Sequence, residues 1–162
     1  MNQLLIVLEG TDKRVIKKNV NGIVISKTDE LVINEKYTFL HADFRSIDDL
    51  IKAKQIINNQ IKHIEEIVII NRDIELNMIS YQYDYEYMKE IYQTLANIVF
   101  FLNTLIDSFD KNINFILSFE KSSHYKIHIN NLNDSIVKYL EALKKDLDRS
   151  HQINIKKLNK NL

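Results

Sequence analysis

The sequence predicts an α/β fold built on a mostly parallel sheet. Short apolar runs, typical of strands that are buried on both faces, alternate along the chain with longer segments of helical period. The apolar runs are residues 4–8, 67–71 and 113–119, and the helical segments are residues 46–66, 87–109 and 132–149. Strands that alternate with helices of this length form β-α-β units, in which the strands run parallel. We therefore expect a three-layer α/β architecture.

The length and composition fit a single domain over residues 1–162. Hydrophobic residues make up 45% of the chain and charged residues 27%, which is an ordinary balance for a protein with a buried core. No repeat, linker or low-complexity segment divides the chain. We expect the last residues, 159–162, to form a tail.

The N-terminal part contains one segment whose structure the sequence leaves open. Residues 4–8 predict a buried first strand, and YTFLHADF, residues 37–44, predicts the next one. Between them, residues 11–36 are irregular and fit either a short helix or a β-hairpin that turns at Asn21–Gly22.

The rest of the chain is more regular. Ser46 is a helix N-cap, and acids in the following turn support a helix over residues 46–66. The long helix at 87–109 is apolar on all sides around NIVFFL, residues 97–102. A final strand is expected at residues 152–158.

Charge and composition exclude several classes of function. The chain has 22 basic and 22 acidic residues, so no net field draws it to nucleic acid or to an anionic membrane. The absence of cysteine excludes disulfides, thiolate metal sites and cysteine nucleophiles. The N-terminal segment has no basic leader and is too short to span a bilayer. We therefore expect a cytoplasmic protein, and the abundance of Ile, Asn and Lys is typical of an AT-rich bacterial genome.

The order and spacing of the elements resemble those of the short-chain dehydrogenase/reductase family, which has a Rossmann-like fold. HADFRSIDDLIKAKQIINNQIKHIEEIVIIN, residues 41–71, is similar to that family's run from an Asp near the adenine to the strand that ends in Asn-Asn-Ala-Gly. Asp43 and Asn71 fall on the Asp and the first Asn. YLEALKKDLDRSHQINI, residues 139–155, resembles the active-site helix and the strand after it. The resemblance covers roughly residues 37–158.

The cofactor motif of that family is missing. The family uses a glycine-rich first turn, in which backbone N–H groups approach the pyrophosphate of a nicotinamide cofactor. Here the turn is EGTDKRVIKKNV, with Gly10 alone and Glu9 before it. The stretch before Asp43 is also too short for the usual first crossover helix, and the bulky Arg72 follows Asn71 where the family has small residues. We expect no cofactor, and a fold that is truncated at the first crossover.

The resemblance also implies a catalytic Asn, Ser, Tyr and Lys, in which the Lys lies four residues after the Tyr and lowers its pKa. Alignment on LEALKKDL places Ile129 at the Tyr position and Asn133 at the Lys position. The Asn position falls near Thr94 and the Ser position at Ser118. Tyr125–Lys126 is not the pair, because neighbouring helical residues point about 100° apart. These positions are vestigial, and we expect no catalysis.

The matched region ends close to the C-terminus of the chain. In the resembled family, further elements after the last matched strand complete the sheet and cover the substrate. Only LNKNL, residues 158–162, remains here. We therefore expect the fold to be truncated at the C-terminal end as well, without a substrate pocket.

Two features predict a protein-binding surface. Tyrosines alternate with polar residues in YQYDYEY, residues 81–87, and tyrosine supplies a large amphipathic contact area; the alternative is that two of them pack on a neighbouring helix. The all-apolar helix at 87–109 requires a partner, and in the resembled family this helix and the next one pair across a dimer. The candidate interface residues are Tyr81, Tyr83, Tyr85, Tyr87, Leu95, Val99, Phe101, Leu102, Tyr139 and Leu143.

Together these patterns favour a non-catalytic interaction subunit, which forms a homodimer or pairs with a catalytically active relative. Two alternatives stay open. One is a divergent NAD(P)-dependent reductase that uses Ser118, His124, Tyr125 or His128. The other is a small inhibitor or immunity-type protein. The His124 and His128 pair is not expected to bind a metal, because no Glu or third ligand accompanies it.

Overall fold

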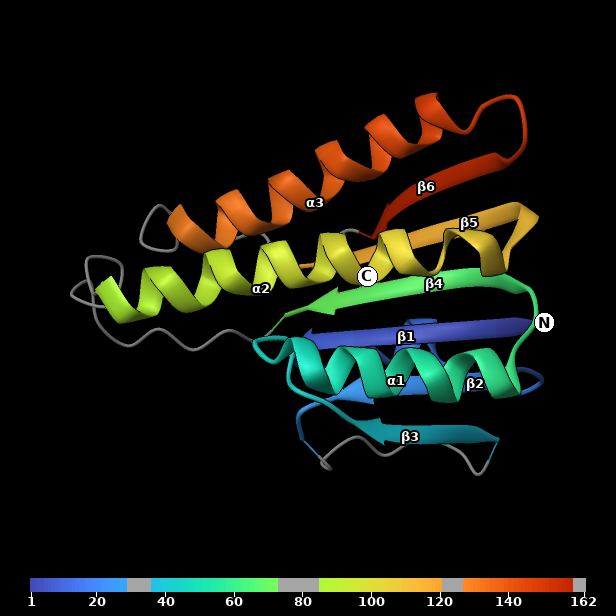
Figure 1. Cartoon of the computed structure of the whole chain (residues 1–162), viewed down its shortest axis with the longest axis horizontal. Coiled ribbons are helices and arrows are strands. Elements are labelled where there is room, and N and C mark those ends of the chain that lie inside the picture. The colour runs from blue at the N-terminus through green and yellow to red at the C-terminus, as the bar shows by residue number, and fades with distance from the viewer. Residues whose placement is uncertain (29–35, 73–84, 121–126, 159–162) are drawn as a thin grey trace.

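The computed structural model describes residues 1–28, 36–72, 85–120 and 127–158. They form a six-stranded parallel sheet in the order β3-β2-β1-β4-β5-β6, which is the order of a Rossmann-like fold (Figure 1). The strands are β1 (Asn2–Glu9), β2 (Asn21–Ser26), β3 (Tyr37–His41), β4 (Ile64–Asn71), β5 (Phe109–Phe119) and β6 (Gln152–Leu158). The helices are α1 (Ile47–Gln60), α2 (Tyr85–Thr104) and α3 (Ile127–Asp146), with 3-10 turns η1 (Lys13–Val15) and η3 (Ile106–Ser108). The predicted α/β fold is confirmed.

The three α-helices cover the same face of the sheet (Figure 1). They connect β3 to β4, β4 to β5 and β5 to β6, and right-handed crossovers that advance in one direction along a sheet place their helices on one face. The main hydrophobic core lies between these helices and the sheet. It joins strand residues such as Ile69 and Phe115 to helix residues such as Leu102 and Leu140.

The opposite face of the sheet is covered by the segment between β1 and β2, residues 10–20, which we call the strap. It contains η1 in place of a crossover helix, so the predicted truncation of the first crossover is confirmed. Val15 and Val20 of the strap pack in a second hydrophobic cluster with Leu5 and Val68 of the sheet. The third layer of the fold is therefore a short strap.

Buried polar contacts hold the strap at the amino end of the sheet. Lys17 Nζ lies 2.9 Å from Glu66 Oε2, and the Gln3 side-chain amide donates to the Val15 carbonyl (3.0 Å) and to Glu66 Oε1 (2.7 Å). The Tyr37 hydroxyl donates to Gln3 Oε1 and accepts from the Lys17 backbone N–H. Since Gln3 and Glu66 are almost fully buried, these bonds compensate the cost of removing them from water.

Of the two alternatives for residues 11–36, the hairpin is wrong. β2 runs parallel to β1, with Asn21 opposite Asn2. Gly22 lies inside β2 opposite Tyr37, and a Cβ atom there would lie 2.2 Å from the Tyr37 ring. The glycine is therefore needed for the close approach of that ring. The short-helix alternative corresponds to η1, and residues 29–35 lie outside the described part.

The strands β4 and β5 begin earlier than the sequence pattern indicates. The helix expected over residues 46–66 ends at Gln60, and β4 begins at Ile64. The helix expected over 87–109 ends at Thr104. Polar residues at the start of each strand interrupt the apolar run, although backbone pairing already continues through them.

In the described part of the chain, no helix has the length and apolar character needed to cross a bilayer.

Candidate functional site

The carboxyl ends of β1, β4 and β5 meet at one edge of the sheet. Here the strand order changes direction, since β1 continues to β2 on one side and lies beside β4 on the other. Ligands of open parallel sheets bind at such a switch point. The residues at this edge are Glu9 and Gly10 at the end of β1, Asn71 and Arg72 at the end of β4, and Ser118, the last residue but one of β5.

Asp12 at the start of the strap binds across this edge. Its carboxylate accepts at least four hydrogen bonds: from the Arg14 backbone N (3.0 Å), Arg14 Nε (2.9 Å), Arg14 Nη2 (2.7 Å) and Ser118 Oγ (2.5 Å). Asp12 and Ser118 are 106 residues apart in sequence, and both are buried. The turn after β1 is therefore attached to the end of β5 by a charged group of the chain itself.

The Asp12 carboxylate is ionised over the physiological range. Burial raises the pKa of Asp12, but the hydrogen bonds from Arg14 and Ser118 outweigh burial and hold its pKa at about 2. A dinucleotide-binding turn offers its backbone N–H groups to a phosphate. In this turn the Arg14 backbone N–H is already bonded to an internal anion.

Of the four positions aligned with the catalytic residues of the resembled family, Ser118 alone keeps the residue type, and it is fully buried. Its hydroxyl donates to Asp12, while Arg72 Nη1 lies 3.4 Å from Ser118 Oγ and 3.4 Å from the Phe119 carbonyl. A hydroxyl without exposed surface that is already committed to a carboxylate is not available to a substrate. Ser118 therefore acts as a structural link between the strap and β5.

The other vestigial positions are also committed to structure. Asn71 Nδ2 donates to Asn133 Oδ1 (2.8 Å), a buried bond that joins β4 to α3. Ile129 lies in the main hydrophobic core. Thr94 Oγ1 donates to the Glu90 carbonyl one turn earlier in α2 (2.8 Å). The structure brings Asn71 and Asn133 together. Ile129 is instead packed in the core, and the Thr94 hydroxyl is bonded within α2.

Asp43, at the position of the family's Asp near the adenine, is held by Arg45. The carboxylate binds the Arg45 guanidinium at 2.7 Å, and hydrogen bonds from Arg45 lower the pKa of Asp43. Arg45 Nη1 also lies 3.3 Å from Glu90 Oε1. The cavity beside Asp43 has a volume of about 60 Å³, far below the roughly 300–1,000 Å³ typical of ligand pockets.

These residues do not fit a nicotinamide dinucleotide. The turn after β1 has one glycine with positive φ, Gly10 (φ 76°), and carries the acids Glu9 and Asp12 where a pyrophosphate would add further negative charge. The following η1 turn is three residues long, so it lacks the dipole of a full helix N-terminus. On the adenine side, the Asp43 carboxylate is already paired with Arg45.

The predicted interface residues fall into two groups. Phe101, Leu102 and Leu143 are 1%, 0% and 7% exposed and fill the main hydrophobic core, so the prediction that they form an interface is wrong. Side chains that cover the sheet within the chain have no surface left for a partner. The NIVFFL segment looks apolar on all sides because Ile98, Phe101 and Leu102 fill the core while Phe100, which is also apolar, lies outside it.

The remaining candidates lie nearer the surface. Tyr85 is 69% exposed, and Val99 is half-buried. Tyr87, Leu95 and Tyr139 are partly buried and pack against the main core. Burial raises the pKa of Tyr139 to about 12, so its hydroxyl stays protonated and donates to Asn103. Tyr81 and Tyr83 lie outside the described residues, as do His124, Tyr125 and the tail at 159–162.

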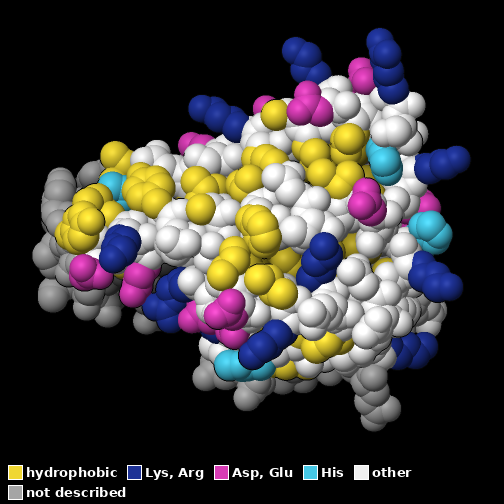
Figure 2. All heavy atoms as spheres, in the orientation of Figure 1, with side chains coloured by type: hydrophobic (Ala, Val, Ile, Leu, Met, Phe, Trp, Pro, Cys, Tyr) yellow, Lys and Arg dark blue, Asp and Glu magenta, His cyan; other side chains and the backbone are white. Residues whose placement is uncertain are grey.

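The outer side of α2 presents aromatic residues that the sequence analysis did not select. Phe100 is 45% exposed and Tyr92 is 40% exposed, and the segment from residue 91 to 106 contains no charged residue. Tyr92 also contacts His128 of α3, with a hydroxyl–Nδ1 distance of 3.1 Å. Figure 2 shows apolar side chains gathered over α2 and toward α3. We define the α2–α3 surface by Tyr85, Tyr92, Val99 and Phe100 of α2 with Ile127 and Tyr139 of α3.

The helical period of α2 contained the signal that separates Phe100 from Phe101. Ile91, Ile98 and Leu102 repeat at the spacing of one buried stripe, and all three are buried. On a helical wheel Phe101 lies at the border of this stripe and Phe100 lies well outside it. Weighing each residue against the stripe would have indicated that Phe100 is the exposed member of the pair.

Sequence comparison finds no match, whereas structural comparison finds solved proteins with a similar fold. No protein-family model and no curated protein matches the sequence. A short-chain dehydrogenase family protein from Francisella tularensis has a TM-score of 0.73 and 16% identity, over 96% of this chain and 67% of that one. A short-chain dehydrogenase/reductase from Brucella melitensis has a TM-score of 0.74 and 15% identity, over 96% of this chain and 74% of that one. A 3-ketoacyl-(acyl-carrier-protein) reductase from Brucella melitensis, solved with NADH, has a TM-score of 0.69 and 16% identity, over 98% and 74%.

The chain therefore has the short-chain dehydrogenase/reductase fold, and the resemblance seen in the sequence is confirmed at the level of the fold. It spans 67–74% of the length of these three proteins. At identities of 14–16% among dehydrogenases and reductases such as these, the likeness concerns architecture and does not carry an activity across.

Proposed function

We propose that this chain is a non-catalytic interaction subunit with the short-chain dehydrogenase/reductase fold. It binds a protein partner through the α2–α3 surface, and the partner is a second copy of the chain or a catalytically active protein of the same fold. The observation that carries the proposal is the Asp12 carboxylate, which accepts the Arg14 backbone N–H of the turn after β1 and the Ser118 hydroxyl.

The first argument concerns the cofactor edge. A bound pyrophosphate would have to displace Asp12 from Arg14 and Ser118 and would then face an ionised carboxylate. Both steps oppose binding, because a buried carboxylate that loses its partners is strongly destabilised. The chain keeps the fold, but its turn after β1 is not open to a cofactor pyrophosphate, and this supports a role in binding a protein.

The second argument concerns the α2–α3 surface. The cores of protein interfaces are depleted in charge and enriched in aromatic residues. Tyr92 and Phe100 are exposed on the part of α2 from residue 91 to 104, which carries no charged residue, and Tyr85 is exposed at the start of the same helix. A neutral surface of this kind is compatible with its own copy across a two-fold axis, since no like charges are brought together.

The cofactor part of the proposal is tested by titration with NADH and with NADPH. We expect no saturable change in nicotinamide fluorescence up to about 1 mM cofactor, which corresponds to a binding free energy weaker than about −4 kcal/mol. An active short-chain dehydrogenase serves as the positive control. One-to-one binding of either cofactor in the micromolar range would establish the reductase alternative.

The interaction part is tested by Phe100→Glu. We expect the native mass, measured by light scattering after gel filtration of the protein isolated gently from its own host, to fall from that of an assembly to that of a monomer. A desolvated interface charge without a partner costs several kcal/mol of association energy. The free energy of unfolding should change by about 0.5 kcal/mol or less, because Phe100 is on the surface.

Ile51→Glu is the matched control for Phe100→Glu. Ile51 is 44% exposed against 45% for Phe100, but it lies on α1 outside the α2–α3 surface. The control should keep the native mass of the unmodified protein. A monomeric unmodified protein without a co-purifying chain, or an equal loss of mass in both variants, would contradict the proposed surface.

A further inference from the structure

The strand β6 has one open side. In the described ranges of the chain it pairs with β5 alone and forms the last strand of the sheet. Its outward backbone N–H and C=O groups therefore have no strand partner. An edge of this kind is a template on which an extended segment of another chain can add a further strand.

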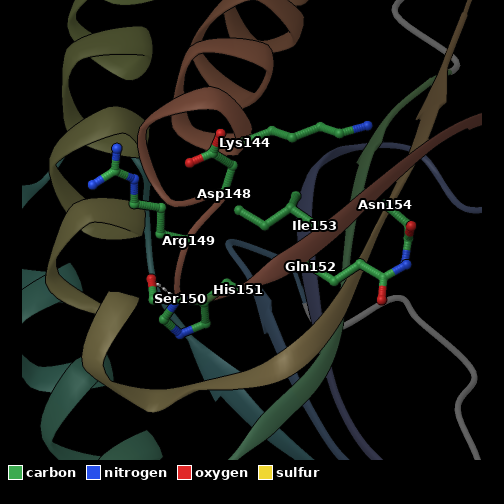
Figure 3. A pocket seen from close by; sticks show the side chains of 8 residues that line it. All are labelled: Lys144, Asp148, Arg149, Ser150, His151, Gln152, Ile153 and Asn154. Carbon is green, nitrogen blue, oxygen red and sulfur yellow. Dashed lines mark hydrogen bonds between the residues drawn. The ribbon is translucent and has the colours of Figure 1, made fainter.

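A hollow lies beside the first half of β6, below the C-terminal end of α3. It has a volume of about 460 Å³, within the range of roughly 300–1,000 Å³ typical of ligand sites. Its lining residues are Lys144, Asp148, Arg149, Ser150, His151, Gln152, Ile153 and Asn154. Figure 3 shows Lys144 extending from α3 above Ile153 toward Asn154, so that a helix and a strand edge form the two walls.

Both faces of β6 offer apolar surface that an added strand can continue. Ile155 is half-buried and packs against the main core below α3, and Leu158 is half-buried and packs against the second cluster on the opposite face. Successive side chains of a strand point to opposite faces. A guest segment with apolar residues at suitable positions would extend the cluster on each face.

The charges around the open edge select the partner. The hollow and β6 together carry four cationic side chains and one acidic side chain, Asp148. The cations are Lys144, Arg149, Lys156 and Lys157. None of the four takes part in an ion pair among residues 1–28, 36–72, 85–120 and 127–158. Adjacent Lys156 and Lys157 point to opposite faces of the strand, so a guest meets a cation on either face.

We propose that the open edge of β6 is a second docking site, which takes an acidic, extended segment of another protein as a seventh strand. Backbone hydrogen bonds to β6 would supply register and affinity, and the four cations would supply the preference for acidic sequence. A second copy of the chain is the poorer occupant, because pairing β6 with β6 brings two sets of the same cations to one edge. The site is separate from the α2–α3 surface and does not depend on it.

The test uses a fluorescein-labelled, end-capped peptide, Glu-Val-Glu-Val-Glu-Val-Glu, and fluorescence anisotropy with the full chain. We expect saturable binding that falls by about tenfold or more in the double variant Lys156→Glu with Lys157→Glu. The control double variant Lys52→Glu with Lys62→Glu carries the same change in net charge on exposed positions away from β6, and its affinity should stay within about twofold of the unmodified protein. Bound peptide should also slow amide hydrogen exchange at Ile153–Lys157.

Several results would overturn the site. They are no binding at millimolar protein, equal affinity for the peptide with Lys in place of each Glu, equal weakening in the two double variants, or exchange protection outside β6. Self-association that the Lys156→Glu and Lys157→Glu variant abolishes would assign the edge to a second copy instead. Phe100→Glu should leave peptide binding unchanged, which separates this site from the α2–α3 surface.

Discussion

Replacing Phe101 with alanine is expected to lower the free energy of unfolding by about 3–5 kcal/mol. Phe101 is 1% exposed, and its ring meets the Phe44 ring edge to face with centroids 6.3 Å apart. Truncation removes this contact and leaves a cavity where α2, the loop before α1 and the sheet meet. Urea unfolding followed by circular dichroism, at one fixed protein concentration, measures the loss.

Phe100→Ala is the control, since it removes the same side chain one position earlier in the same helix. Phe100 is 45% exposed, so its removal should change the free energy of unfolding by about 0.5 kcal/mol or less while it weakens assembly. The two neighbouring substitutions should therefore separate stability from association. Equal destabilisation by both would mean that α2 does not face the sheet as described.

Asp12→Ala is expected to lower the free energy of unfolding by about 2–4 kcal/mol at pH 7. The substitution removes the acceptor for Arg14 and leaves the fully buried Ser118 hydroxyl without that partner. It also releases the strap at the carboxyl edge of the sheet. Ser118→Ala should cost less, because Asp12 then keeps its hydrogen bonds from Arg14. A change below about 0.5 kcal/mol for Asp12→Ala would show that the strap is held by other contacts.

The contribution of Asp12 to stability should depend on pH with a defined sign. Its pKa is about 2 in the folded chain against an ordinary value of 3.8, so the folded state favours the ionised form. The stabilisation is complete above pH 3.8 and is lost as the pH falls through about 2. The difference in unfolding free energy between the unmodified protein and Asp12→Asn should therefore narrow over this window. A difference that stays constant down to pH 2 would contradict the ionised hydrogen-bonded carboxylate.

Much of the architecture was predictable because it depends on local periodicity. Apolar runs at residues 4–8, 67–71 and 113–119 are buried strands in the structure, and the segment 132–149 lies largely within α3. The spacing of apolar residues within a segment indicates whether the segment is buried on one face or on both, independently of the neighbouring segments. The missing crossover helix was likewise predictable, since the stretch between the first strand and Asp43 is too short for it.

The incorrect predictions, by contrast, concern features that depend on contacts between segments. Asn21–Gly22 is a strong hairpin signal, but Gly22 is required by the ring of Tyr37 on the neighbouring strand, which local sequence does not show. Phe100 and Phe101 have the same chemistry and differ in the direction that each side chain takes from α2. The position of the helix on the sheet decides which of them is buried.

The features of the candidate site were also predictable only in part. The loss of the glycine-rich turn and of a Tyr–Lys pair could be predicted from the residues at single positions. The bond from Asp12 to Ser118 could not, because the two residues are 106 positions apart and meet only when β1 and β5 lie in one sheet. The open edge of β6 is also a property of strand order and cannot be recognised from the strand's own residues.

The sequence by itself determined the α/β class, the alternation of strands and helices, and the absence of a glycine-rich phosphate turn. Each of these follows from residue types and their spacing along the chain, which act over a few residues. The tertiary structure alone decided that the strap packs on the second face, that the Asp12 carboxylate binds the turn after β1 to Ser118, and that Phe100 rather than Phe101 faces outward. These depend on contacts between segments distant in sequence, and such contacts exist only after the sheet has assembled.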